Sequence, residues 1–107
     1  MVRQSSNIPG VTVLEQPEIA AIELADVLHA LSDPARLEIV RGLATDGERQ
    51  CGSFDLGLTK ATRSHHFKVL REAGLTRTRV VGTARYVTLR RDELDGKFPG
   101  LLHAVTR

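Results

Sequence analysis

The hydrophobic spacing between Thr59 and Leu89 changes once, from the period of a helix to the period of a β-strand. Thr59 is a suitable N-cap, and the residues after it predict a helix that ends at Gly74, since glycine is favoured just beyond a helix terminus. The following segments TRTRVV and ARYVTLRR alternate in polarity around Gly82-Thr83, which predicts a β-hairpin. A helix followed at once by a hairpin restricts the fold more than any other feature of this sequence.

Two helices are expected upstream. EIAAIELADVLHAL, residues 18–31, is apolar on a broad stripe, and Pro17 suits the first turn of its helix. Ser32-Asp33-Pro34 then supplies a stop, a cap and a proline at a first helical position, so PARLEIVRGLA predicts a second helix ending at Asp46-Gly47. The expected buried residues of this second helix are Leu37, Ile39, Val40 and Leu43.

The other segments complete the fold prediction. ERQCGSFDLGL leaves room only for a short helix, and the tail predicts a short helix from near Asp92, a break at Pro99-Gly100 and a last apolar turn. The predicted class is therefore mainly α (α+β), a winged helix-turn-helix with about five helices and a two-stranded β-hairpin wing. Residues 1–16 are expected to form a flexible N-terminal arm, with VTVL as a candidate edge strand, and residues 17–107 to form the domain.

Positive charge is concentrated in one part of the chain. Between Gly57 and Arg91 there is a single acidic residue, Glu72, whereas the rest of the sequence has twelve acidic and six basic residues. The nine basic residues of this segment are Lys60, Arg63, Lys68, Arg71, Arg77, Arg79, Arg85, Arg90 and Arg91. A basic block on an otherwise acidic domain indicates a polyanionic partner.

Composition excludes several classes of protein. A chain of 107 residues predicts one domain, and its single cysteine can form neither an internal disulfide nor a site with several thiolates. The sequence has no apolar run long enough for a membrane span and no secretory signal, so a cytoplasmic location is expected. Because it also lacks a Gly-rich phosphate loop, paired catalytic carboxylates and a nucleophile–histidine constellation, we predict no enzymatic activity.

Three segments together resemble the ArsR/SmtB family of bacterial repressors: ALSDPARLEIVRGL, TKATRSHHFKVLREAGL and RVVGTARYVTL. The resemblance extends over roughly residues 19–95. It implies a homodimeric repressor that dimerises through its first and last helices, binds an inverted repeat in double-stranded DNA, and is released by an inducer or by reaction of a thiol. The paired cysteines of the family are missing here, and neither the inducer nor the operator can be read from the sequence.

The resemblance also implies which residues contact DNA. On the capped helix it assigns base or phosphate contacts to Lys60, Ala61, Thr62, Ser64, His65, His66 and Lys68. Arg63 and Arg71 on the same helix join this predicted surface. On the hairpin, the implied contacts to phosphate or the minor groove are Arg79, Thr83 and Arg85.

The adjacent histidines do not suit a metal site. His65 and His66 lie about 100° apart around a helix, so they cannot form the i, i+4 pair that binds one metal ion. We expect His65 to face DNA and His66 to be half-buried, with one ring nitrogen as a structural anchor. The alternative is that both simply lie at the surface.

Two further candidate sites lie outside the basic segment. Some members of the resembled family bind zinc near the last helix, and here Asp92, Asp95 and His103 are available. Their spacing differs from the Asp-x-His spacing of that zinc site, so no metal or cofactor is predicted. Cys51 is a candidate redox switch if Arg49 lowers its pKa, and otherwise an ordinary half-buried cysteine.

The expected function is that of a dimeric, sequence-specific transcriptional regulator, and the resemblance implies that it is a repressor. The alternative is a winged-helix module whose basic face binds an acidic protein. Discrimination between DNA sequences separates these two hypotheses.

Overall fold

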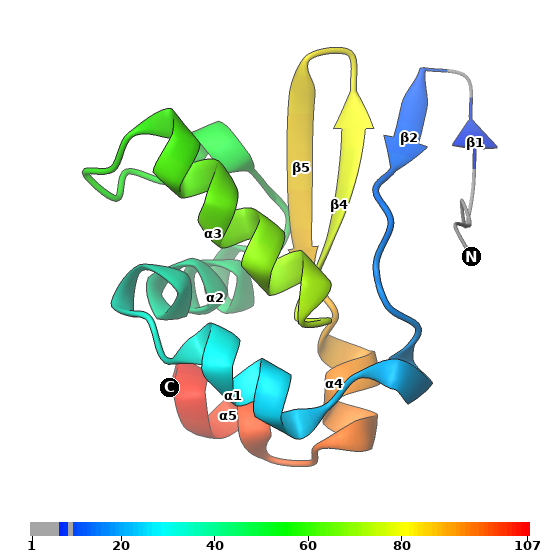
Figure 1. The fold of residues 1–107 in the computed structure, drawn as a ribbon, viewed down its shortest axis with the longest axis vertical. Helices are drawn as coiled ribbons and strands as arrows, with labels where there is room; N and C mark the ends of the chain where they lie inside the picture. The colour runs from blue at the N-terminus through cyan, green and yellow to red at the C-terminus, as the bar shows by residue number, and fades with distance from the viewer. Residues whose placement is uncertain (1–6, 9) are drawn as a thin grey trace.

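A computed structural model describes residues 7–8 and 10–107, which form five α-helices and a five-stranded antiparallel sheet (Figure 1). The helices are α1 (Leu24–Leu31), α2 (Pro34–Asp46), α3 (Lys60–Glu72), α4 (Arg91–Lys97) and α5 (Leu101–Thr106). Single 3₁₀ turns are η1 (Ile19–Ala21) and η2 (Cys51–Ser53). The strands are β1 (Asn7–Ile8), β2 (Val11–Val13), β3 (Arg49–Gln50), β4 (Thr76–Val81) and β5 (Ala84–Leu89), and their order in the sheet is β1-β2-β4-β5-β3.

The predicted winged helix-turn-helix is confirmed. The Asp33 carboxylate accepts hydrogen bonds from the backbone N–H groups of Ala35 (2.8 Å) and Arg36 (3.2 Å), and α2 ends before Gly47 at φ 78°. The hairpin turns at Gly82-Thr83, which places Val81 opposite Ala84. The segment between α2 and α3 contains the two-residue strand β3 and the 3₁₀ turn η2, so the short helix for which the sequence leaves room is a single 3₁₀ turn.

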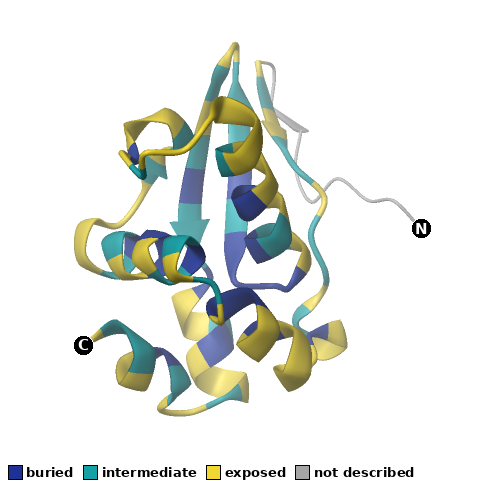
Figure 2. Cartoon of the chain, turned by 60° about the vertical axis from the view of Figure 1, so that its left-hand side comes forward, coloured by how far each residue is buried: buried dark blue, intermediate teal, exposed yellow. Residues whose placement is uncertain are grey.

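The core lies where α3 meets α1, α2 and the base of the hairpin. Phe67 and Leu70 of α3 are buried together with Ile39 and Val40 of α2 and Val87 of β5. Figure 2 shows these buried bands inside the domain, whereas the first turns of α3 are exposed. The helix is therefore fixed along one side and open along the other.

The hairpin is the centre of a wider sheet. β2 pairs with β4 on one side of it, and β3 pairs with β5 on the other. Residues 1–6 and 9 of the expected arm lie outside the described residues. Within the arm, Val11–Val13 form the strand for which VTVL was a candidate, but β1 pairs with its other side, so β2 is not at the edge of the sheet. The boundary at residue 16 stays a prediction.

The expected helix over residues 18–31 is wrong in its first half. Residues 19–21 form η1, Ile22 and Glu23 are extended, and α1 begins only at Leu24. The Lys97 ammonium donates to the carbonyl oxygens of Ile19 (2.8 Å), Ala20 (3.2 Å) and Ile22 (2.6 Å), which a continuous helix would use internally. A tertiary contact has therefore replaced helical hydrogen bonds.

Among the described residues, no helix has both the length and the apolar composition needed to cross a lipid bilayer.

Candidate nucleic-acid interface

The first turns of α3 form an exposed surface that begins at a side-chain cap. The Thr59 hydroxyl oxygen accepts from the backbone N–H of Thr62 (3.2 Å) and donates to the Thr62 hydroxyl (3.0 Å). The exposed residues of α3 ahead of its last turn are Lys60, Ala61, Thr62, Ser64, His65 and Lys68. The cap leaves these side chains outside the core, on a rigid helix, where they can contact a partner.

The two adjacent histidines have different environments. His65 is exposed, whereas His66 is 8% exposed and its Nδ1 lies 3.2 Å from Nη1 of Arg36. Because a guanidinium only donates, Nδ1 accepts this hydrogen bond, and a neutral ring carries its proton on Nε2. His66 therefore has the anchoring position expected of it and lies inside the domain rather than on the α3 surface.

The two arginines expected to act together in the wing lie on opposite faces of the hairpin. Arg85 pairs across the strands with Val80, and Arg79 pairs with Tyr86, so their side chains point to opposite sides. Arg79 donates to both carboxylate oxygens of Glu48 (2.8 and 2.9 Å), and its guanidinium lies 4.4 Å from the Tyr86 ring centroid. These hydrogen bonds hold the pKa of the Glu48 carboxyl below its usual range. Arg79 is thus already neutralised within the chain.

A groove of about 630 Å³ separates α3 from the hairpin. The lining of this α3–wing groove comes from α3, from the hairpin and from the segment around η2, and consists of Gln50, Cys51, Gly52, Lys60, Arg63, Ser64, Phe67, Lys68, Arg71, Thr78, Thr83, Ala84 and Arg85. None of these residues is acidic, and five are cationic. Figure 1 shows the arrangement of the elements that line the groove: the green helix α3 meets the base of the yellow hairpin and diverges from the hairpin above that point.

The nine basic residues of the charged segment fall into two groups. Four of them have partners within the chain. Glu93 pairs with both Arg77 and Arg90, and Glu48 pairs with Arg79. Arg90 also donates to the Pro17 carbonyl, and Arg91 donates to the Ala44 carbonyl. The other five line the α3–wing groove and have no hydrogen-bond or ion-pair partner within the described part of the chain: Lys60, Arg63, Lys68, Arg71 and Arg85. The fold therefore gathers the uncompensated charge on one side of α3.

The structure does not support the expected effect of Arg49 on Cys51. The Arg49 guanidinium lies 3.7 Å from the Phe54 ring centroid and donates to Ser53 and Asp46. Burial raises the pKa of the Cys51 thiol, and the charges of Arg85, Arg63 and Arg71 oppose this shift only in part. A raised pKa favours the protonated thiol, which is the less reactive form.

The metal-site candidates remain at the surface. Asp92 and Asp95 on α4 and His103 on α5 are all exposed. Within residues 7–8 and 10–107, no three His, Cys, Asp or Glu side chains come together as a set that could hold a metal ion.

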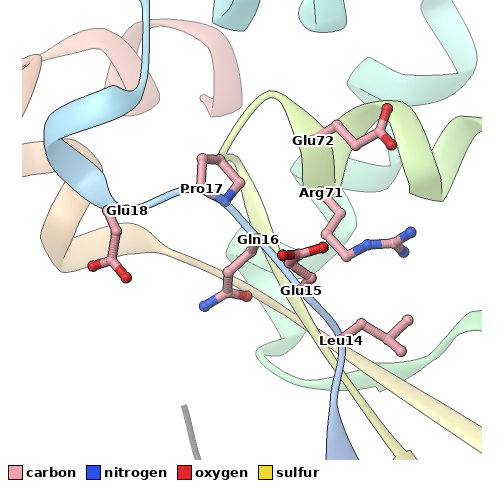
Figure 3. Close-up of a pocket in the computed structure, with 7 residues that line it drawn as sticks. All are labelled: Leu14, Glu15, Gln16, Pro17, Glu18, Arg71 and Glu72. Atoms are coloured by element: carbon pink, nitrogen blue, oxygen red, sulfur yellow. The ribbon is translucent and has the colours of Figure 1, made fainter. Parts of the chain in front are cut away.

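A second cavity, of about 880 Å³, lies between the end of α3 and the segment that links β2 to η1 (Figure 3). Glu15, Glu18 and Glu72 line it together with Arg71. Figure 3 shows that the Glu18 carboxylate points away from those of Glu15 and Glu72, so the three acids do not converge on one ligand position.

The sequence analysis missed Arg36, which holds α3 in place. Its Nε donates to the Ala30 carbonyl (2.7 Å), Nη2 donates to the His29 carbonyl (3.3 Å), and Nη1 contacts His66. One side chain therefore joins the last turn of α1 to α3. The available signal was spacing, because Arg36, Val40 and Leu43 recur at four and three residues and share a face of α2.

The chain matches a helix-turn-helix domain family over residues 31–79, which includes α2, α3 and most of β4. It is 44% identical over 84 residues to the HTH-type transcriptional regulator YceK of Bacillus subtilis, covering 76% of this chain and 84% of that protein. It is 36% identical over 78 residues to the biofilm growth-associated repressor of Xylella fastidiosa, covering 71% of this chain and 67% of the repressor.

Comparison with solved structures agrees with these sequence matches. The crystal structure of NolR from Sinorhizobium fredii superposes with a TM-score of 0.59 at 27% identity, covering 82% of this chain and 85% of that one. The two sequence relatives are named as regulators of transcription and not as enzymes. The exposed capped helix, the wing and these matches together lead to one conclusion: the chain belongs to the winged helix-turn-helix family of DNA-binding transcriptional regulators.

Proposed function

We propose that this regulator is a homodimeric repressor of the ArsR type, which binds an inverted-repeat operator and is released by an inducer or a redox signal. In this proposal α3 enters the major groove, where Lys60, Thr62, Ser64 and His65 read base edges, with Ala61 placed to contact a thymine methyl group. The phosphate contacts are assigned to Arg63, Lys68, Arg71, Thr83 and Arg85. We leave out His66, which is buried, and Arg79, which is paired with Glu48.

One observation carries this proposal: the five partnerless cations lie beside the exposed face of α3, while the other four basic residues of the segment have ion-pair or hydrogen-bond partners within the fold. A surface that interacted only with water would gain nothing from collecting like charges around a groove, because they repel each other. Phosphate groups on both sides of a helix in the major groove would neutralise them.

The dimer is supported by an exposed apolar face of α1. Leu24 and Leu28 lie one helical turn apart, and they are 45% and 48% exposed. Burying such a pair against a second copy is favourable by about 25 cal/mol for each Å² of apolar surface removed from water. A two-fold dimer would place two α3 helices about 34–36 Å apart, in successive major grooves of one duplex face.

The dimer can be tested with Leu28→Lys. We expect the wild-type chain to sediment as a dimer at micromolar concentration and the variant to sediment as a monomer, because a charge in the interface is costly to bury. Glu38→Lys, on the exposed side of α2, makes a similar surface change and should leave the dimer intact. If the wild-type chain and both variants all sediment as monomers, this part of the proposal is wrong.

The DNA surface can be tested with two charge-matched variants of the wing, Arg85→Gln and Arg79→Gln. Arg85→Gln should weaken binding to every sequence and reduce the slope of log K against log salt by about 0.9, the value for one lost phosphate contact. Arg79→Gln should leave that slope unchanged, because Glu48 already neutralises Arg79. Fluorescence anisotropy across a salt series measures both. Equal slopes for the two variants would contradict the assignment of Arg85.

A further inference from the structure

We propose that the α3–wing groove is also a binding site for a small polyanion with two or more carboxylate or phosphate groups, and that this ligand competes with DNA. The competition rests on the proposed function, whereas the binding site itself does not. The regulator would then have its effector site within its DNA-binding surface.

The size and depth of the groove suit a small ligand. Its volume of about 630 Å³ falls within the range of roughly 300–1,000 Å³ that is usual for small-molecule sites. Phe67 and Thr78 line it although they are only 4% and 1% exposed, so they form its floor. The broad surface of a duplex can contact the cations at the rim, whereas a small molecule that fits the groove can also approach this floor.

The charges of the groove favour an anion from outside the chain. Arg63, Arg71 and Arg85 line the groove together with Cys51, and no acidic residue lines it. Arg71 is half-buried, and desolvation together with the charge of Arg85 lowers the pKa of its guanidinium. The negative charge of an anion bound between these side chains would offset the repulsion between Arg71 and Arg85 and favour the charged form of both.

Thr78 adds a directional contact. Its hydroxyl oxygen is buried and has no hydrogen-bond partner among the described atoms, which is unusual because buried hydroxyl groups are normally paired. As a donor it could bind one oxygen of a carboxylate or phosphate. Thr76, two residues earlier on the same strand and face, also has an unpaired buried hydroxyl, but it does not line the groove. The chain therefore contains its own matched control.

The test is calorimetric titration of the full chain without DNA, at constant ionic strength, with inorganic pyrophosphate and with citrate. Acetate is the singly charged control. We expect one site with a dissociation constant below about 1 mM for at least one polyanion, and much weaker binding of acetate. Thr78→Val should raise that dissociation constant about tenfold, the usual effect of losing a hydrogen bond to a charged group, while Thr76→Val should leave it unchanged.

A further pair of variants distinguishes binding in the α3–wing groove from general electrostatic attraction of an anion to the protein. Arg85→Gln removes a cation of the groove, and Arg107→Gln removes one at the exposed C-terminus, which Figure 1 places beside α1 and away from the hairpin. Only Arg85→Gln should weaken binding of the polyanion. Three results would each contradict the proposed site. These are equal losses of affinity in Arg85→Gln and Arg107→Gln, equal effects of Thr76→Val and Thr78→Val, or binding of the polyanions that is no tighter than that of acetate.

The competition is measured separately. At constant ionic strength, a saturating concentration of the bound polyanion should raise the dissociation constant of the DNA complex, and an unchanged constant would overturn the regulatory role. If the chain binds no operator at all, the proposed function fails, but the titration without DNA still decides whether the site exists.

Discussion

Replacing Arg36 with methionine should lower the free energy of unfolding by about 3 kcal/mol, because a buried guanidinium that serves three acceptors is lost. The substitution keeps an aliphatic side chain of similar length, but it leaves the Ala30 carbonyl and His66 Nδ1 without their donor. These acceptors belong to the last turn of α1 and to the middle of α3. The loss should therefore affect both the stability of the domain and the position of α3.

Urea denaturation followed by circular dichroism measures this effect. Arg41→Met is the matched control, because Arg41 is exposed on the same helix and donates only to the Val105 carbonyl (2.9 Å). We expect the control to change stability by less than about 0.5 kcal/mol. Arg36→Lys should rescue only part of the loss, since one ammonium cannot reproduce the guanidinium fork. Equal stability of Arg36→Met and Arg41→Met would show that the buried link contributes nothing.

Gly74→Ala should destabilise the junction between α3 and the hairpin by about 2–4 kcal/mol, from backbone strain and overpacking together. Gly74 has φ 93°, a left-handed conformation that alanine adopts poorly. It ends α3, and the N–H of the next residue, Leu75, donates to the Leu70 carbonyl (3.0 Å). An added Cβ would also collide with Cδ1 and Cγ1 of Ile22, which is itself buried.

Gly96→Ala provides a control of opposite sign. Gly96 lies within α4, and a Cβ there would have nothing within 4 Å. The substitution should stabilise the protein by about 0.5–1 kcal/mol, because alanine loses less backbone entropy in a helix. Thermal unfolding of the two variants gives the comparison. A Gly74→Ala protein as stable as the wild type would mean that α3 can end in another conformation.

The parts of the fold that depend on local rules could be predicted from the sequence. Asp33-Pro34, Thr59 and Gly74 specify the helix boundaries through caps and backbone preferences, and the turn at Gly82-Thr83 specifies the register of the hairpin. The separation of Arg79 from Arg85 could also have been predicted, because a two-residue turn places residue 80 opposite residue 85. The resemblance assigned both arginines to DNA contacts, and the alternation of side chains across the turn was not applied to them.

The remaining features depend on contacts between distant segments. The first helix starts late because the Lys97 ammonium, more than seventy residues away, takes up the carbonyl groups of η1. Likewise, the division of the basic residues into paired and partnerless groups depends on Glu48 and Glu93, whose positions follow from the tertiary fold. Charge counting indicated a polyanionic partner but could not show which five cations remain available.

We propose above that the exposed face of α3 and the α3–wing groove recognise a particular DNA sequence. The most direct test is fluorescence anisotropy of the purified chain with the DNA upstream of its own gene and with a shuffled duplex of the same composition, across a salt series. We expect at least about 10³-fold preference for the upstream DNA, with two chains bound per duplex and a steep salt dependence. Equal and weak binding to both duplexes would contradict this claim and leave the basic face as a docking surface for an acidic protein.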